Sequence, residues 1–447
     1  MLLLHPLHRG DENLSVDFLH ILTFSLIGFV IGVFTALIPG MHVNTVSLML
    51  VSFQSPFLII SDIMSVDDYL MPLLVSSSII SVYITHTFVN IIPATFLGVP
   101  EEGVALTMLP THSLLLKGRG YEAIYLSAMG SFFSAVVTIL LMFSLKFLLS
   151  DPVNLYASLK EIMVWIIIAV ISVMILTEKS PKAMLISSTI LLLSGVYGLI
   201  VLDLPLESPF GLPSSSLFPS LAGLFGLSTL LSSVLSKTSM VRQGLHEPVF
   251  QRKDKLSGIV SVLTGSFSGI LVSIIPGVTT AIGTIIALVT RGESDERQAI
   301  ITLSSVNTAV SIATIFNLFV IGKTRSGVAV VVRNLIGAET WKGFLPPYSL
   351  LCLLIPVVIS ASLSLPITCR IGKFLSEKIG KINYQKITWA GISLIIALVF
   401  MFSGFAGLFI LFTGASIGLL PIFTGARRSS CMGILLIPLL IRFLGNS

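Results

Sequence analysis

The sequence predicts an all-α polytopic integral membrane protein of about 12–14 transmembrane helices, arranged as two inverted repeats with broken or re-entrant helices. Of its 447 residues, 54% are hydrophobic and only 11% are charged, which is outside the range of soluble domains. Apolar runs of roughly 20 residues recur, as at 18–38, 124–149 and 350–368, and each can cross about 30 Å of hydrocarbon as a helix. A pattern of glycines followed by Pro-Gly occurs once in each half.

The basic residues lie in short clusters between the apolar runs. The longest hydrophilic stretch, 237–255, holds five Lys or Arg residues against Glu247 and Asp254, so we expect it on the cytoplasmic side. It divides the chain into an N-terminal transmembrane repeat (1–236), a basic cytoplasmic linker (237–256) and a C-terminal transmembrane repeat (257–447). The basic residues behind the net charge of +5 are therefore interpreted as signals of membrane orientation, and they do not indicate nucleic acid as a partner.

The smaller basic clusters are expected on the same side as this linker. They include Lys117/Arg119, Arg291/Arg297 and Arg427/Arg428. When the chain is threaded through the membrane between these anchors, seven spans separate the two copies of the glycine pattern.

Four positions in the first half recur in the second with a constant offset of 237 residues. They are Gly28, Gly32, Pro39 and Gly40, which correspond to Gly265, Gly269, Pro276 and Gly277. A weaker match, at an offset of 224, relates Gly98 and Gly103 to Gly322 and Gly327. Identical spacing predicts an internal duplication, and an odd number of spans between the copies predicts that they run in opposite directions.

The glycine pair and the Pro-Gly pair each have a physical interpretation. Glycines four residues apart let two helix backbones approach closely, so they predict helix packing. Pro-Gly ends a helix, and only 13 residues separate Gly277 from Arg291, which is about 20 Å of helix and too short to span the bilayer. The break is therefore expected inside the membrane, where the first backbone amides of the next helix can bind an anion.

The candidate substrate-binding residues lie at and just after the two breaks, together with one asparagine of the second half. They are Pro39, Gly40, His42, Asn44, Thr45, Pro276, Gly277, Thr279, Thr280 and Asn307. Asn90 and Asn317 lie in apolar surroundings and need a partner or a cavity. Glu101 and Glu102 lie either at the membrane surface or at a cation. The candidates for binding a coupling ion are therefore Glu101, Glu102, Asn90 and Asn317.

The same motifs, followed by Gly-Val-Pro at 98–100, Leu-Pro-Thr-His at 109–112 and Lys-Gly-Arg-Gly-Tyr-Glu-Ala at 117–123, resemble a known family. The chain looks like the large membrane subunit (TctA) of tripartite tricarboxylate transporters, particularly its shorter archaeal-type relatives. The resemblance implies a permease for an organic anion, coupled to a proton or sodium gradient. Carried over by position, it places Pro39, Gly40, Asn44, Pro276, Gly277 and Thr279 at the substrate. It does not carry citrate-like specificity, because Gly-Val-Pro-Glu-Glu at 98–102 replaces the family's Pro-Gly-Thr-Pro loop.

The expected partners are a small anionic substrate, a coupling ion and the lipid bilayer of the cell (cytoplasmic) membrane. The family resemblance adds a solute-binding protein and a small membrane subunit, although the chain could act alone, and a homo-oligomer is compatible with the sequence. No cofactor or metal is expected, and no enzyme, because neither His-Glu-xx-His nor a nucleophile elbow occurs. One alternative stays open: a translocase for polyprenyl phosphate, a lipid carrier, whose members also carry paired Pro-Gly breaks.

Overall fold

The computed structural model describes residues 11–38, 43–52, 67, 70–98, 106–150, 153–156, 161–176, 178, 180–211, 214, 216–235, 243–245, 248, 252–274, 280–292, 295–324, 326–379 and 384–445. Every regular element within these ranges is helical. The elements are α1 (Asp11–Leu37), α2 (Val43–Ser52), α4 (Met71–Val89), α5 (Ile91–Leu97), α6 (Met108–Leu116), α7 (Gly120–Leu149), α9 (Met163–Leu176), α10 (Pro181–Val201), α11 (Leu217–Leu221), the π-helix η3 (Ala222–Leu227), α12 (Ser228–Leu235), α13 (Arg252–Ile274), α14 (Thr280–Arg291), α15 (Glu296–Val320), α16 (Gly327–Ile336), α17 (Tyr348–Ile379), α18 (Tyr384–Thr424), the 3₁₀ helix η4 (Arg428–Met432) and α19 (Gly433–Leu444).

The surface of the helices is that of a membrane protein. Large hydrophobic side chains point outward, among them Phe34 (67% exposed), Trp165 (71%) and Phe409 (76%), and such a surface is stable only in lipid. Within the described residues, nine helices are long and apolar enough to span a bilayer, and three shorter apolar helices accompany them. The prediction of an all-α polytopic membrane protein is confirmed, and the expected 12–14 spans are approached only when the short helices are counted.

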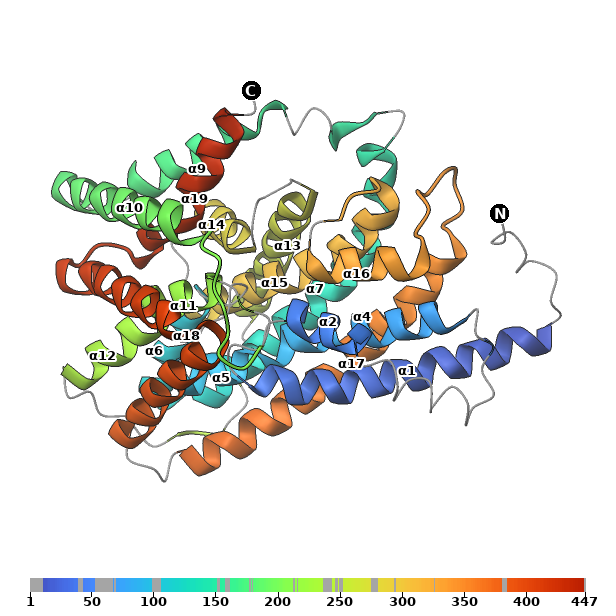
Figure 1. Cartoon of the computed structure of the whole chain (residues 1–447), viewed down its shortest axis with the longest axis horizontal. Coiled ribbons are helices and arrows are strands. Elements are labelled where there is room, and N and C mark those ends of the chain that lie inside the picture. Colours follow the sequence, from blue (N-terminus) through green and yellow to red (C-terminus); the bar gives the residue numbers. More distant parts are fainter. Residues whose placement is uncertain are drawn as a thin grey trace.

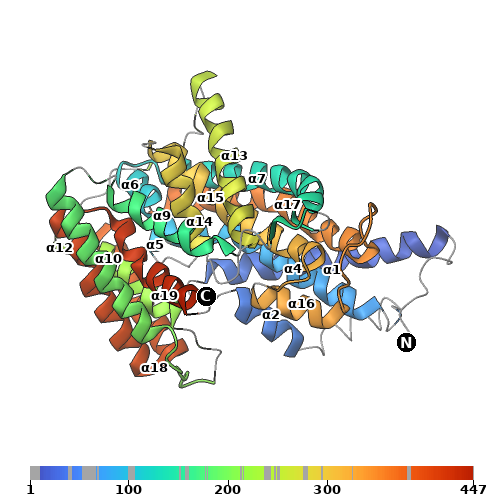
Figure 2. The ribbon, with the colours of Figure 1, turned by 90° about the horizontal axis from the view of Figure 1, so that it is seen from above.

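The helices form two bundles, which Figure 2 shows side by side. The first contains α1, α2, α4, α7, α13 and α15–α17, and the second contains α9–α12, α18 and α19, with α5, α6 and α14 between them (Figures 1 and 2). Both bundles draw helices from both sides of the 237–256 linker. The segments 1–236 and 257–447 are therefore interleaved in space.

The glycine pairs pack helix against helix, as the sequence predicted. A Cβ on Gly28 would lie 2.2 Å from the Ser78 carbonyl oxygen of α4, and one on Gly265 would lie 2.4 Å from the Thr302 carbonyl oxygen of α15. One turn later, Gly32 faces Val82 and Gly269 faces Val306. The glycines are 237 residues apart and the positions they touch are 224 apart, which are the two offsets found in the sequence. Their interpretation as helix-packing sites is confirmed.

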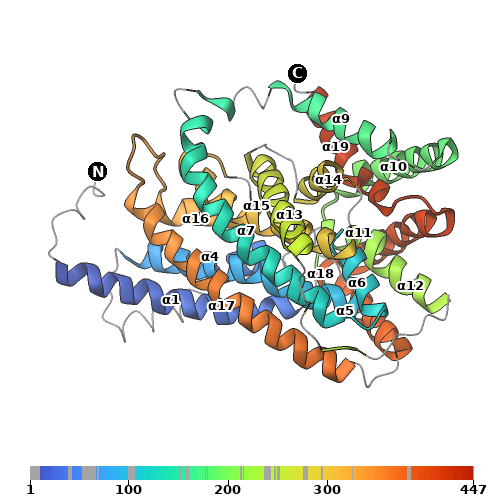
Figure 3. The ribbon, with the colours of Figure 1, turned by 180° about the vertical axis from the view of Figure 1, so that it is seen from behind.

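The contact positions also give the helix directions. Along α1 and α4, and along α13 and α15, the contacting residue numbers rise together, so each pair is parallel. Helix α7 is parallel to α15, because Gly130 contacts Ile301 and Phe143 stacks on Phe316. Helix α17 is antiparallel to α7: Phe344, just before α17, stacks on Phe147, and Gly372 near its other end meets Ile124 (Figure 3).

Figure 1 shows α1, α4 and α17 running in one common direction across the bundle. The set α1, α4 and α17 therefore runs opposite to the set α7, α13 and α15.

Local breaks follow proline and glycine. Asn90 separates α4 from α5, because Pro93 has no amide hydrogen to continue the helical ladder. Within α18, Gly404 adopts φ 61° and ψ −159°, a conformation that glycine tolerates and that interrupts the helix there. The polar N-caps Asp295 and Ser326 fix the starts of α15 and α16 by accepting bonds from Gln298 N (2.9 Å) and Ala329 N (3.2 Å).

Candidate functional site

The helix after the second break folds back along the first. Gly283 of α14 packs against Val272, close to the end of α13. At the other end of α14, the Arg291 guanidinium donates to Ser257 Oγ, near the start of α13, at 2.9 Å. Helices α13 and α14 are thus antiparallel neighbours. The Pro-Gly break itself lies outside the described residues, so the choice between a broken and a re-entrant helix stays a prediction.

Several predicted site residues lie outside the described residues. They are Pro39, Gly40, His42, Pro276, Gly277, Thr279, Glu101 and Glu102. Thr45 lies in α2, and Thr280 is the partly buried first residue of α14. The geometry around the breaks is therefore built on Asn44, Asn307, Asn317 and their neighbours.

Asn44, in the first turn of α2, joins the first break to the second half of the chain. Its Oδ1 accepts a hydrogen bond from the Val328 amide at 3.2 Å, and Gly327 packs directly on its side chain. The Val328 amide is one of the first amides of α16, which have no partner within the helix. The positive ends of two short helices, α2 and α16, therefore meet at Asn44.

Helices α4 and α15 bring polar side chains of the two halves together. The Asn307 amide donates to the Thr87 carbonyl oxygen at 3.5 Å, and the Thr87 and Thr308 hydroxyls are 3.2 Å apart. Both helices are almost wholly buried in the bundle, where such polar groups are costly unless they are bonded. Asn307, a candidate substrate-binding residue in the sequence, thus contacts Thr87 of the N-terminal segment.

Asn317 lies beside the second break. Its Nδ2 donates to the Ser273 carbonyl and hydroxyl oxygens at 3.0 and 2.9 Å, one residue before the end of α13. Its Oδ1 is buried and accepts no hydrogen bond from the described residues. Asn90 is also buried, but its position is the kink between α4 and α5. The two asparagines proposed for ion coupling therefore occupy different local settings.

Helix α6 brings a third short-helix N-terminus to the boundary between the bundles. Thr107 is its N-cap residue, and the buried Thr107 hydroxyl has no partner among the described residues. Leu106, one residue earlier, packs in one cluster with Ile282 and Ile285 of α14. The start of α6 thus shares a hydrophobic cluster with α14.

The setting of Arg428, which is half-buried, was missed at the sequence level. Arg428 was expected as a surface anchor, but its guanidinium donates to the Leu224 and Phe225 carbonyl oxygens and to the Ser228 hydroxyl of the π-helix region. A π-turn leaves carbonyls that need donors, and single-sequence patterns do not predict such turns. Burial lowers the pKa of Arg428 to about 10.

The positive charge of the Arg428 guanidinium acts on His112 of α6. Burial lowers the pKa of His112 to about 4, the charge of Arg428 acts in the same direction, and a hydrogen bond with the Thr95 backbone opposes both. The imidazole is therefore neutral at physiological pH.

Ion pairs tie the two halves together at one end of the bundle. Glu122 pairs with Arg119 and with Arg297, each at 2.6 Å, and Glu296 pairs with Lys117 at 2.7 Å. These residues come from the α6–α7 turn, α7 and the start of α15, so the cluster joins residues from both sides of the linker. We call this end of the bundle the basic end.

These features define a class of protein: a helical membrane protein in which short helices follow breaks and meet with their N-termini inside the bundle, as in secondary transporters. The chain belongs to the tripartite tricarboxylate transporter TctA family, whose model matches residues 22–433. The family predicted from the motifs is thereby confirmed. An uncharacterized protein of Methanocaldococcus jannaschii is 28% identical over 430 residues, which cover 95% of this chain and 99% of that protein. No solved structure matches the chain.

Proposed function

We propose that the chain is a permease of the cell (cytoplasmic) membrane that carries an organic anion of the di- or tricarboxylate kind, coupled to a proton or sodium gradient. The anion would bind between the short helices that follow the two breaks. The observation that carries this proposal is the meeting of the α2 and α16 N-termini at Asn44, because the positive ends of two helix dipoles favour a negative charge between them.

We further propose that the two halves are inverted repeats. In support, the same glycine contacts occur in α1–α4 and α13–α15, and these pairs run in opposite directions. In such a fold the substrate sites lie where the repeats meet, near the middle of the membrane. The contact of Asn307 and Thr308 with Thr87 belongs to that meeting surface.

For coupling, we propose Asn317 as a ligand for the cation. Its Oδ1 accepts no hydrogen bond from the described residues, its Nδ2 binds the Ser273 carbonyl near the end of α13, and amide and carbonyl oxygens are the ligands that sodium accepts at broken helices. Glu101, Glu102 and Asn90 remain candidates for the same role. Family membership also supports a solute-binding protein and a small membrane subunit as partners.

Binding to the purified protein tests this function without the need for partner subunits. We expect succinate or citrate to raise the melting temperature, more so with sodium or at lower pH. Asn44→Ala should abolish the carboxylate shift, and Asn317→Ala should abolish its dependence on the cation. The matched control is Lys373→Gln, a change at an exposed residue outside the proposed site. No shift with any carboxylate, in a protein that is folded, would refute the proposal.

The alternative, a polyprenyl-phosphate translocase, needs a laterally open apolar groove. One such groove exists, between α7 and α13. The same melting experiment separates the two functions, because a translocase would respond to an isoprenoid phosphate and not to a carboxylate.

A further inference from the structure

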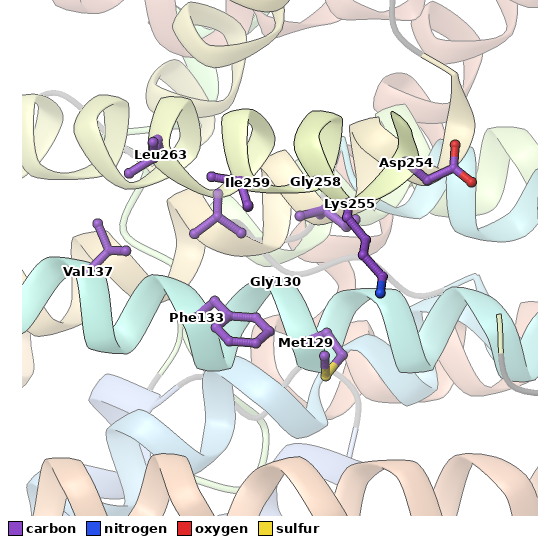
Figure 4. A pocket seen from close by; sticks show the side chains of 11 residues that line it. Met129, Gly130, Phe133, Val137, Asp254, Lys255, Gly258, Ile259 and Leu263 are labelled. Carbon is purple, nitrogen blue, oxygen red and sulfur yellow. The ribbon is translucent and has the colours of Figure 1, made fainter. Parts of the chain in front are cut away.

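Helices α7 and α13 enclose an apolar groove with a volume of about 470 Å³ (Figure 4). Met129 and Phe133 of α7 form one wall, and Gly258, Ile259 and Leu263 of α13 form the other. Ile301 of α15 forms the floor. None of these residues belongs to the proposed substrate site, so the groove needs a separate explanation.

The groove results from how the two helices rest on α15. They touch at Ser134 and Ser266, whose hydroxyls are 2.9 Å apart. The groove runs alongside this contact, from Met129 to Val137 on α7. On the α7 side, Gly130 sits tightly on the Ile301 backbone. On the α13 side, a Cβ on Gly258 would find nothing closer than Ile301 Cδ1 at 3.9 Å. The space over Ile301 is therefore a built wedge, open to the side.

The wedge opens onto the lipid phase. Phe133 and Ile259 are 47% and 57% exposed on helices that are both long and apolar enough to span a membrane. One end of the groove lies at the start of α13, where Figure 4 shows the Lys255 side chain reaching over the groove toward Met129, with Asp254 pointing away.

Lys255 also differs from the cations near it. Lys117, Arg119 and Arg297 each pair with Glu296 or Glu122, whereas no carboxylate among the described residues pairs with Lys255. The N-terminus of α13 adds the positive end of a helix dipole at the same place. The groove is thus apolar along its length. At one end it is lined by Lys255 and Asp254, of which Lys255 reaches over the groove.

We propose that this groove holds an anionic phospholipid, with one acyl chain over Ile301 and the phosphate at Lys255. Among the described residues, Lys255 is the cation that lines this groove, and an apolar groove with a cation at one end matches one lipid, since basic pockets between transmembrane helices on the cytoplasmic side bind anionic head groups. A partner helix would bury its side chains on the apolar walls and would not need the cation.

The test is to measure lipid retained by the purified protein after transfer to detergent, by mass spectrometry of the intact protein and of its lipid extract. The protein is first incubated with vesicles of equal phosphatidylglycerol and phosphatidylcholine. Wild type should retain phosphatidylglycerol selectively. Lys255→Gln should lower retention about five-fold or more, since one Lys near an anionic surface contributes about 1 kcal/mol.

Gly258→Leu should displace the chain by filling the wedge, and its Cβ meets no clash. The matched controls are Lys373→Gln, which removes an exposed charge elsewhere, and Leu256→Trp, which adds volume to an exposed residue outside the groove. Retention that is equal in wild type and both groove variants would overturn the proposal. So would retention of polyprenyl phosphate in place of phosphatidylglycerol, or crosslinking of Gly258→Cys to a second protein chain.

Discussion

Two glycines on the same helix, Gly265 and Gly258, should respond in opposite ways to the same added methyl group. A Cβ on Gly265 would lie 2.4 Å from the Thr302 carbonyl oxygen and 2.6 Å from Ser305 Cβ, so α13 would have to move away from α15 by about 1 Å to restore normal van der Waals contact. Overpacking of this kind costs about 1–3 kcal/mol. The shift would also stretch the Ser134–Ser266 hydrogen bond.

Gly258 faces the open wedge, where the nearest atom is 3.9 Å from the new Cβ. Alanine there adds no clash and removes the conformational cost of glycine in a helix, which is about 0.5–1 kcal/mol. Gly258→Ala should therefore match or exceed the wild type in stability, and Gly265→Ala should fall about 2 kcal/mol below Gly258→Ala. Unfolding in one fixed lipid nanodisc composition measures both. Equal stability of the two variants would refute the register of α13 on α15.

Three further predictions follow from buried polar groups. The pKa of His112 is about 4 in the folded chain against about 6.5 in the unfolded chain, so protonation favours unfolding. The free energy of unfolding is therefore full above pH 6.5 and declines by about 3 kcal/mol as pH falls to 4. His112→Gln should flatten this part of a curve of melting temperature against pH, and an unchanged curve would contradict the prediction. Glu122→Gln should lower the free energy of unfolding by about 1–2 kcal/mol and weaken its salt dependence, because Arg119 and Arg297 lose their carboxylate partner. Equal salt dependence in the variant and the wild type would argue against the ion pairs. Asn44→Ala should speed hydrogen exchange at the Val328 amide, whereas Thr189→Ala, on the exposed face of α10, should not.

Much of the packing could be read from the sequence because it depends on local, periodic signals. The pairs Gly28/Gly32 and Gly265/Gly269 predicted close helix contacts, and both pairs pack on a neighbouring helix. The offset of 224 found between Gly98 and Gly322 also relates the residues of α4 and α15 that these glycines touch. Apolar run length gave the fold class for the same reason.

Features that depend on tertiary contact were out of reach. The antiparallel packing of α14 on α13 depends on the contact of Gly283 with Val272 and Val306. The length of the 13-residue segment between Gly277 and Arg291 does not specify that contact. Arg428 looked like a topology anchor because its partners are backbone carbonyls of a π-turn some 200 residues earlier. The groove beside Lys255 depends on how α7 and α13 rest on α15. The candidate site is thus anticipated in residue type, at Asn44, Asn307 and Asn317, and not in pairing.

The central claim, transport of an organic anion driven by an ion gradient, is tested most directly by uptake into proteoliposomes that contain this chain, with or without its family's partner subunits. With an imposed sodium or proton gradient, labelled succinate or citrate should accumulate above its external concentration, and the accumulation should vanish when the gradient is collapsed or when Asn44 is replaced by Ala. Uptake that stays at the level of empty liposomes for every carboxylate, while the same vesicles move a polyprenyl phosphate between leaflets, would contradict the account.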